Sequence, residues 1–179
     1  ARSPMAEASF RDHSNENLLE RLCVQRSDMV LAPSNMGADA LARISSADKV
    51  HVVPPGVNVD AFDWEHPPTS GPPVLLYLGS LTKGRGLQIL LRAMFEIAKR
   101  SEAVLVLAGP GDPAFRETIQ RSVEELGLGE RVRLLGDISH DLAPAIIGRA
   151  TVCVAPAASE VESRATVLYP TKLLEYMAC

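Results

Sequence analysis

The second half of this sequence alternates short apolar runs with helical stripes, and this alternation limits the folds open to it. Val74–Leu78 is apolar at every position and lies between Pro73 and Gly79, as is typical of a strand buried on both faces of a parallel sheet. Apolar residues then recur at i, i+3, i+4 and i+7 spacing over 86–100, which predicts an amphipathic helix. The same reasoning predicts strands at 103–108, 131–135 and 151–155, and helices at 113–126 and 142–147. Strands separated by helices of this length predict an α/β fold with right-handed crossovers and a parallel sheet.

The first half of the chain predicts a shorter series of the same kind. We expect a helix over 14–25, a strand over 29–32, a helix that Ser34 caps and a strand over 50–53, followed by a proline-rich linker up to Pro73. The last ten residues begin like a helix, with Leu173, Leu174 and Met177 spaced for burial. Because no cap ends this helix, we expect the natural protein to continue beyond Cys179.

Composition excludes several classes of function. With 46% apolar and 22% charged residues, the chain has an ordinary globular composition. A formal net charge of −4 without a cluster of lysines and arginines argues against a nucleic-acid polymer as partner. The three cysteines lie far apart without metal-ligand spacing, so we expect no metal site, and thiols in a reducing cytoplasm.

The turn between the first strand and helix of this series has the composition of a phosphate site. Three glycines, Lys83 and Arg85 lie within 79–86, directly before the positive end of a helix dipole. A P-loop is excluded because Arg85-Gly86 stands where that motif needs lysine and a hydroxyl residue. A nicotinamide site is poorly supported, since the second strand ends in Gly109-Pro110-Gly111 without the acidic residue that such sites carry. The alternative is a glycine-rich turn that binds nothing.

Five passages together resemble one family, the retaining GT-B glycosyltransferases of family 4, which use nucleotide sugars. The passage 53–62 is similar to the "V-I-P-N-G-V-D-x-x-x-F" motif between the two domains of that family. The others are Gly79-Ser-Leu-Thr-Lys-Gly-Arg-Gly86, Leu107-Ala-Gly-Pro-Gly-Asp112, Arg131-Val-Arg-Leu-Leu-Gly136 and Pro170-Thr-Lys-Leu-Leu-Glu-Tyr-Met-Ala178. They resemble "G-R-L-x-x-x-K-G", "L-x-G-x-G", "R-V-x-F-L-G" and "P-x-K-x-x-E-Y-M-A" in the family's order.

The resemblance implies a Rossmann-like three-layer α/β/α fold with a parallel sheet, as an incomplete C-terminal domain of GT-B type preceded by the tail of an N-terminal domain. We expect the tail of the N-terminal acceptor domain over 1–49, an interdomain strand and linker over 50–73, and a truncated nucleotide-sugar-binding domain over 74–179.

Residue roles carry over from this resemblance. Arg85 falls on the family's lysine, which implies a contact with the diphosphate, and Lys83 is expected to supply the charge that Ser80 lacks at the family's arginine position. These two cations are the expected catalytic residues. Glu175 falls on the glutamate that holds the ribose hydroxyls, whereas Val167 replaces its partner glutamate. The full set of expected donor-binding residues is Gly79, Ser80, Gly109, Gly111, Ile138, Thr171, Lys172 and Glu175.

Other roles for these side chains remain open at this point. Arg85 can be a solvated charge, and Glu175 can lie on an exposed helix face, paired with Lys172 or in water. Asp112 and Asp137 fit turns better than catalysis, and structural roles are favoured for the four histidines.

The reaction implied is transfer of a hexosyl group from a nucleotide diphosphate sugar to an acceptor hydroxyl with retention. The nucleotide sugar is a co-substrate, and no cofactor is implied. A carbohydrate or lipid-linked acceptor would bind through the missing N-terminal domain. A peripheral membrane contact of the full-length protein is left open. This chain alone is therefore expected to be inactive. The alternative is a non-catalytic nucleotide-binding or protein-interaction module derived from a GT-B domain.

Overall fold

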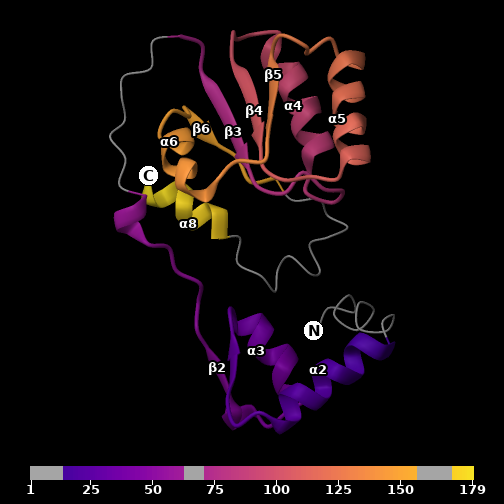
Figure 1. Ribbon diagram of the computed structural model, residues 1–179, viewed down its shortest axis with the longest axis vertical. Helices are drawn as coiled ribbons and strands as arrows, with labels where there is room; N and C mark the ends of the chain where they lie inside the picture. Colours follow the sequence, from indigo (N-terminus) through magenta and orange to yellow (C-terminus); the bar gives the residue numbers. More distant parts are fainter. Residues whose placement is uncertain (1–13, 63–70, 157–170) are drawn as a thin grey trace, which may run out of the picture. The chain divides into compact units, whose positions relative to one another are not determined.

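The computed structural model describes residues 14–62, 71–156 and 171–179, which divide into two compact units. The first unit ends at Gly56, and the second begins at Val57 and includes the last helix (Figure 1). The expected domain division of a longer protein stays a prediction.

The second unit is built on a four-stranded parallel sheet. Its strands are β3 (Val74–Leu78), β4 (Val104–Ala108), β5 (Val132–Gly136) and β6 (Val152–Cys153), in the order β5-β4-β3-β6. The central pair is in register from Val74 opposite Val104 to Leu78 opposite Ala108. The parallel α/β expectation is confirmed, and the first strand has the bounds that its apolar run predicts.

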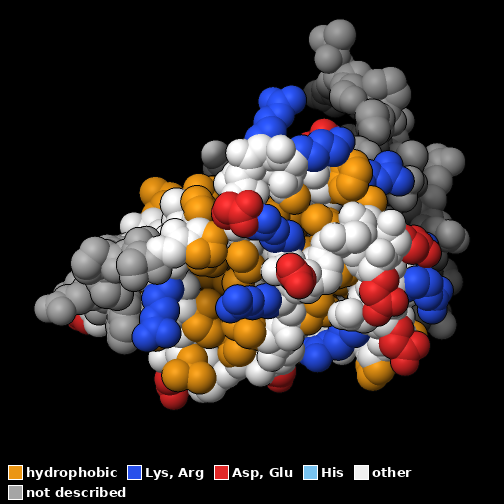
Figure 2. Space-filling model, turned by 90° about the horizontal axis from the view of Figure 1, so that it is seen from above, with side chains coloured by type: hydrophobic (Ala, Val, Ile, Leu, Met, Phe, Trp, Pro, Cys, Tyr) orange, Lys and Arg blue, Asp and Glu red, His pale blue; other side chains and the backbone are white. Residues whose placement is uncertain are grey.

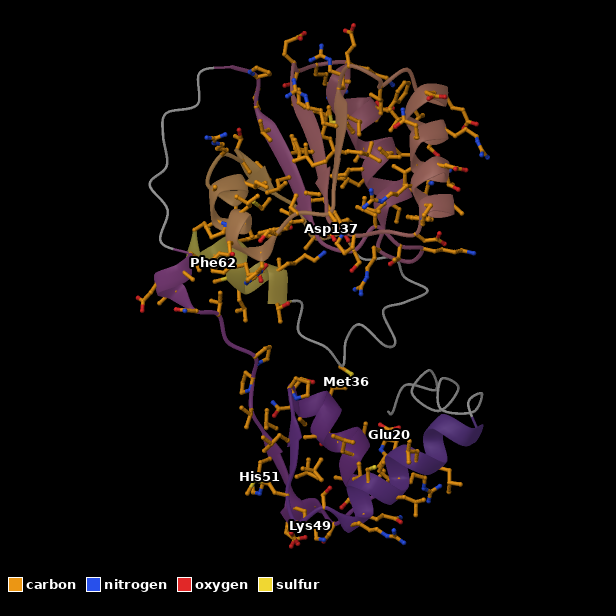
Figure 3. All side chains as sticks on the ribbon, viewed as in Figure 1. Glu20, Met36, Lys49, His51, Phe62 and Asp137 are labelled. Carbon is orange, nitrogen blue, oxygen red and sulfur yellow. The ribbon has the colours of Figure 1, made fainter. Side chains whose placement is uncertain are left out.

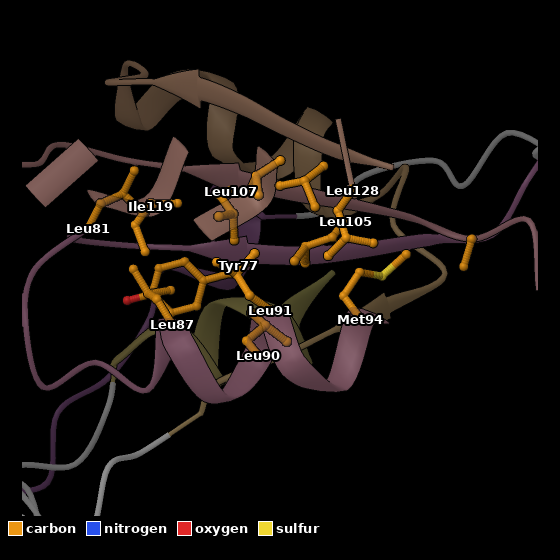
Figure 4. Close-up of a cluster of buried hydrophobic side chains, with 13 residues drawn as sticks. Tyr77, Leu81, Leu87, Leu90, Leu91, Met94, Leu105, Leu107, Ile119 and Leu128 are labelled. Atoms are coloured by element: carbon orange, nitrogen blue, oxygen red, sulfur yellow. The ribbon is translucent and has the colours of Figure 1, made fainter. Parts of the chain in front are cut away.

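Two helices cover one face of this sheet, α4 (Leu87–Ala98) and α5 (Pro113–Glu125). The side chains between helices and strands form one buried cluster, and Tyr77, Leu91 and Met94 within it have no exposed surface (Figure 4). Because side chains alternate along a strand, Tyr77 belongs to this face and its neighbours Leu76 and Leu78 to the other. The apolar stripe of α4 therefore packs where its spacing predicts.

The opposite face is covered by shorter elements (Figure 1). They are η2 (Val59–Ala61), η3 (His140–Leu142), α6 (Ala143–Ile147) and α8 (Thr171–Ala178), and their cluster holds Leu76, Leu78, Ala143 and Ile147. Phe62, which follows η2, is only 2% exposed and meets the His140 ring edge-on with centroids 5.6 Å apart (Figure 3). Helices on both faces give the three layers that the resemblance implies.

The first unit consists of α2 (Ser14–Arg26), β1 (Val30–Ala32), α3 (Asn35–Ala42), η1 (Ala47–Lys49) and β2 (Val50–Val52). The strands pair in parallel, with Val30 opposite Val50. Ser34 caps α3 as predicted, since its hydroxyl accepts a hydrogen bond of 3.1 Å from the Gly37 N–H. Lys49 Nζ donates a hydrogen bond of 3.2 Å to the Ser27 carbonyl and so ties the segment before β2 to the end of α2.

Two burial predictions are wrong. Met177 is 81% exposed, because α8 turns Tyr176 and not Met177 toward the sheet. The helical spacing of Leu18 and Leu19 within 14–25 also predicts burial, but both are exposed, and among the described side chains of α2 it is Val24 that is buried. Among the described residues, no helix is long and apolar enough to cross a membrane.

Candidate functional site

The order of the strands fixes where a ligand can bind. From β3 the chain adds β4 and then β5 on one side, and it later returns to place β6 on the other side of β3. In doubly wound sheets, ligands bind at such a reversal, in the crevice beyond the carboxyl ends of the strands. The crevice at β3 and β6 is flanked by the turn 79–86 and by α8.

The backbone at this edge is compact because three neighbouring strands run into glycines with positive φ. The values are 143° at Gly79, 135° at Gly109 and 75° at Gly136. A Cβ at Gly109 would collide with the Gly79 carbonyl oxygen, so only glycine fits there. The turns are also joined by hydrogen bonds, from Gly79 N–H to the Ala108 carbonyl at 2.8 Å and from Gly109 N–H to the Gly136 carbonyl at 2.7 Å.

The start of α4 has no side-chain cap. Its N-cap is Gly86, in the left-handed conformation with φ of 72°, and no side chain caps the helix. Helix starts present unpaired N–H groups and a partial positive charge, which together favour an anion. Arg85 and Lys83 are exposed beside this start, and within the described parts of the chain neither forms an ion pair.

Lys172 reaches this edge from the first turn of α8. Its Nζ lies 4.1 Å from the centroid of the Tyr77 ring, and a Cβ added at Gly79 would come within 2.7 Å of that Nζ. Burial, and after it the nearby charge of Arg85, lower the pKa of Lys172 to about 8, against the opposite effect of Glu175. The Tyr77 hydroxyl donates a hydrogen bond of 2.9 Å to the Ser80 carbonyl, which fixes the beginning of the turn.

Tyr176 anchors α8 to the sheet. Its hydroxyl accepts a hydrogen bond of 2.9 Å from the Leu78 N–H and lies 3.3 Å from the Leu78 carbonyl. The pairing of β3 with β6 ends at Leu76. Two residues further on, at Leu78, the Tyr176 hydroxyl binds the backbone in place of a neighbouring strand. Burial and the neighbouring groups raise the pKa of Tyr176, so the hydroxyl keeps its proton. This anchor places Lys172 and Glu175 at the crevice.

Sequence reasoning missed Arg116. Its Nη2 donates a hydrogen bond of 3.1 Å to the Gly109 carbonyl, and a Cβ at Gly136 would lie 3.2 Å from its Nη1. The Nε is buried without a hydrogen-bond partner among the described residues. Arg116 thus joins α5 to the ends of β4 and β5. The available signal was its place one helical turn after Asp112, whose carbonyl accepts from the Arg116 N–H at 2.9 Å.

The structure places the predicted site residues in two groups. Gly79, Ser80, Arg85, Lys172 and Glu175 lie around the ends of β3 and α8, and the first three belong to one turn. Gly109 and Gly111 follow β4.

Ile138 follows β5 and is partly buried, next to the exposed Asp137 at the strand ends (Figure 3). Thr171 is exposed at the start of α8, and Lys83 is exposed in its turn. Asp112, expected as a turn residue, is the N-cap of α5, and Val167 lies outside the described residues. In the part of the chain that the structure describes, no group of His, Cys, Asp or Glu side chains could hold a metal ion.

An open hollow of about 670 Å³ lies at the other edge of the sheet, lined by residues that include Pro73, Glu102 and Arg131. Figure 2 draws the molecule from above, and neither sign of charge dominates among the described side chains of that face. Arg131 is already paired with Glu102 at 2.6 Å. Since these residues precede their strands, the hollow is at the amino ends, where parallel sheets do not form their ligand sites.

Comparison with known proteins agrees with this architecture. Residues 72–179 match the family described as glycosyl transferases group 1. An uncharacterized glycosyltransferase of Methanocaldococcus jannaschii is 30% identical over 156 residues, which cover 79% of this chain and 40% of that protein. The α-D-kanosaminyltransferase of Streptomyces kanamyceticus is 30% identical over 89 residues, or 49% of this chain and 22% of that protein.

Solved structures show the same fold. A sucrose-phosphate synthase from Thermosynechococcus elongatus superimposes with a TM-score of 0.75 at 25% identity, covering 100% of this chain and 44% of that one. Anabaena HepE, solved in complex with UDP and glucose, gives a TM-score of 0.75 at 17% identity, covering 93% and 46%. The chain thus spans less than half the length of these relatives. It belongs to the glycosyl transferases of group 1 and has the GT-B fold.

Proposed function

We propose that this chain carries the donor site of a glycosyltransferase that moves a hexosyl group from a nucleoside diphosphate sugar to an acceptor hydroxyl with retention. The observation that carries the proposal is the uncapped start of α4, flanked by cations at the strand reversal and faced by α8. The HepE structure named above holds UDP and glucose on the same fold, which supports a nucleotide sugar as donor.

The diphosphate would lie at the start of α4. Free N–H groups there can donate to phosphate oxygens, and the exposed Arg85 and Lys83 are within the same turn. Negative charge grows on the diphosphate as the sugar leaves. Cations and helix dipoles aimed at that charge lower the barrier, and this electrostatic term is the main catalytic contribution we assign to the chain.

The nucleoside would lie along the ends of β3 to β5. The backbone around Gly109, Gly111 and Ile138 lines this edge, and the glycines let a ligand approach closely. Glu175 lies in α8, one residue before the Tyr176 anchor. An ionised carboxylate has two oxygens that accept hydrogen bonds and no proton, which suits two adjacent ribose hydroxyls.

The acceptor would be a carbohydrate or a lipid-linked sugar bound by a part of the protein that this chain lacks. We therefore expect no sugar transfer by the chain alone, and activity only in the longer protein. A cytoplasmic location, a peripheral membrane contact and the absence of any metal or cofactor stay predictions.

A non-catalytic nucleotide-binding or interaction module remains the second candidate, favoured by the uncharged Ser80 at the end of β3. Release of free nucleoside diphosphate from a donor sugar by the full-length protein, with an acceptor extract, separates the two.

The binding step is tested first on this chain, by thermal unfolding with UDP, GDP or ADP and with the matching nucleosides. We expect at least one diphosphate to raise the unfolding midpoint more than its nucleoside does, since a ligand that binds only the folded state stabilises it. Equal shifts for every pair would contradict the proposed diphosphate site.

A further inference from the structure

The ammonium of Lys172 lies over the Tyr77 ring, in a space that is free because the residue at position 79 is a glycine. Its Nζ lies 4.1 Å from the centroid of the Tyr77 ring, beside Gly79, which follows β3. Any side chain at Gly79 would bring its Cβ to 2.7 Å from this Nζ, and the φ of 143° there also favours glycine. Tyr77 itself is fully buried and held by its hydrogen bond to the Ser80 carbonyl. The aromatic platform and the missing Cβ together hold the ammonium at the carboxyl end of β3.

The charges that face Lys172 come from three elements. Arg85 belongs to the turn after β3, Glu175 lies one helical turn further along α8, and Tyr77 contributes the face of its ring. Within the described residues, the Lys172 ammonium has neither an ion pair nor a hydrogen bond. Burial and the like charge of Arg85 outweigh the effect of Glu175 and lower the pKa of Lys172 to about 8. A partly buried ammonium that also feels the like charge of the exposed Arg85 is unfavourable, and an anion bound to both cations would relieve that cost.

We propose that Lys172 binds the diphosphate of the donor, so that α8 and the turn before α4 each supply one cation, Lys172 and Arg85, to the same anion. The inference rests on the proposed function and extends it. Sequence reasoning assigned the second charge to Lys83, whose side chain is exposed, whereas Lys172 is seated on an aromatic ring beside the uncharged Ser80.

A coupling between nucleotide binding and protonation follows. A bound diphosphate favours the ammonium form and raises the pKa of Lys172 above its value of about 8 in the free protein. Below pH 7 the side chain is already protonated, so binding takes up no proton there. Above pH 8 binding must take one up, and the affinity should fall by about tenfold between pH 7 and pH 9.

The stability of the unliganded protein changes with pH in the opposite direction to the binding affinity. Because the folded pKa lies below the unfolded value of 10.5, the charged lysine costs stability below pH 8, and this cost is relieved as the pH rises from 8 to 10.5. Replacing Lys172 by methionine should therefore leave the unfolding midpoint at pH 7 unchanged or raised. A purely structural lysine would lower it when replaced.

The test uses the full chain and isothermal titration with the tightest-binding of UDP, GDP and ADP, and with its nucleoside. We expect Lys172→Met to weaken diphosphate binding by about ten- to hundredfold at pH 7, with less than about twofold change for the nucleoside. The pH dependence between 7 and 9 should vanish in Lys172→Met and also in Lys172→Arg, which stays charged. Lys99→Met, which removes an exposed charge paired with Glu96 on α4, is the matched control and should match the wild type.

Four outcomes overturn the inference. Unchanged diphosphate binding by Lys172→Met overturns it alone and leaves the proposed function standing, as does an equal loss for diphosphate and nucleoside. If the wild type itself does not prefer the diphosphate over the nucleoside, the proposed function fails and the inference fails with it. If Lys172→Met does not fold, the pH profile of Lys172→Arg decides, and a profile like that of the wild type counts against Lys172.

Discussion

The turn after β3 and the turn after β4 start alike and end differently. Both follow central strands that pair in register up to Leu78 and Ala108, and both begin with a glycine of positive φ. After β4, the Asp112 carboxylate accepts a hydrogen bond of 3.1 Å from the Ala114 N–H, and Pro113 occupies the first turn of α5. After β3, α4 starts at Gly86 with no side-chain cap.

The difference separates a helix start that its own side chain caps from one that is free to bind an anion. Asp112 satisfies an amide at the start of α5 and places a negative charge at its positive dipole end, so that end is already neutralised. The start of α4 has cations beside it in place of a carboxylate. Removing the cap in the turn after β4 should therefore change stability, and removing the cations in the turn after β3 should change ligand binding.

Gly109→Ala should have the largest effect. The new Cβ would collide with the Gly79 carbonyl oxygen, and the φ of 135° disfavours any residue with a Cβ. We expect the free energy of unfolding to fall by about 2–5 kcal/mol, from strain and overpacking together. Chemical denaturation measures it, with Gly129→Ala, which has nothing within 4 Å of its Cβ, as control. Equal losses of unfolding free energy in the two variants would show that the turns at Gly79 and Gly109 are not in close contact.

Glu175→Gln should weaken nucleotide binding by roughly 1.5–3 kcal/mol while the fold stays intact, because one acceptor oxygen is lost. A ligand without the 2′-hydroxyl should bind the wild type less tightly and lose little more in the variant. Titration of ribo- and deoxyribonucleoside diphosphates into both proteins measures this. Equal discrimination by the two proteins would make Glu175 a surface charge.

Tyr176→Phe should lower the free energy of unfolding by about 1–2 kcal/mol, since the Leu78 N–H loses its partner at the end of β3. Denaturation of the variant beside the wild type measures the loss. Met177→Leu, at an exposed position of the same helix, should change stability by less than about 0.5 kcal/mol. A Tyr176→Phe variant as stable as the wild type would mean that α8 is held by its apolar contacts alone.

Asp112→Ala should have the smallest effect on stability and none on the ligand. Loss of the cap costs about 1 kcal/mol. The nucleoside diphosphate affinity should stay within about twofold of the wild type, because the Asp112 carboxylate caps α5 and is not part of the proposed diphosphate site. A large loss of affinity without a loss of stability would place the ligand at α5 and reverse the assignment of the two turns.

The sequence predicted the sheet well because its signals are local. Val74–Leu78 is apolar throughout and became β3 unchanged, and the stripe over 86–100 became α4 with its ends trimmed. The capping role of Ser34 was also readable from one residue and its position.

Contacts between segments far apart in the chain were not readable. Met177 was expected to be buried, but a hydrogen bond between Tyr176 and Leu78, ninety-eight positions apart, turns α8 the other way. The fit of Lys172 against Gly79 and the link from Arg116 to Gly109 likewise depend on how separate elements meet. The resemblance named residues for the crevice, yet it gave no reason for their arrangement.

The central claim is that the open turn before α4 binds a diphosphate, and Arg85→Ala tests it most directly. Titration of the full chain with a nucleoside diphosphate and its nucleoside should show a loss of about 1.5–3 kcal/mol for the diphosphate, roughly ten- to hundredfold, and almost none for the nucleoside. Arg92→Ala, an exposed arginine on the body of α4, is the matched control and should bind both ligands as the wild type does. Equal losses for both ligands in Arg85→Ala, or a diphosphate affinity unchanged from the wild type, would contradict the account.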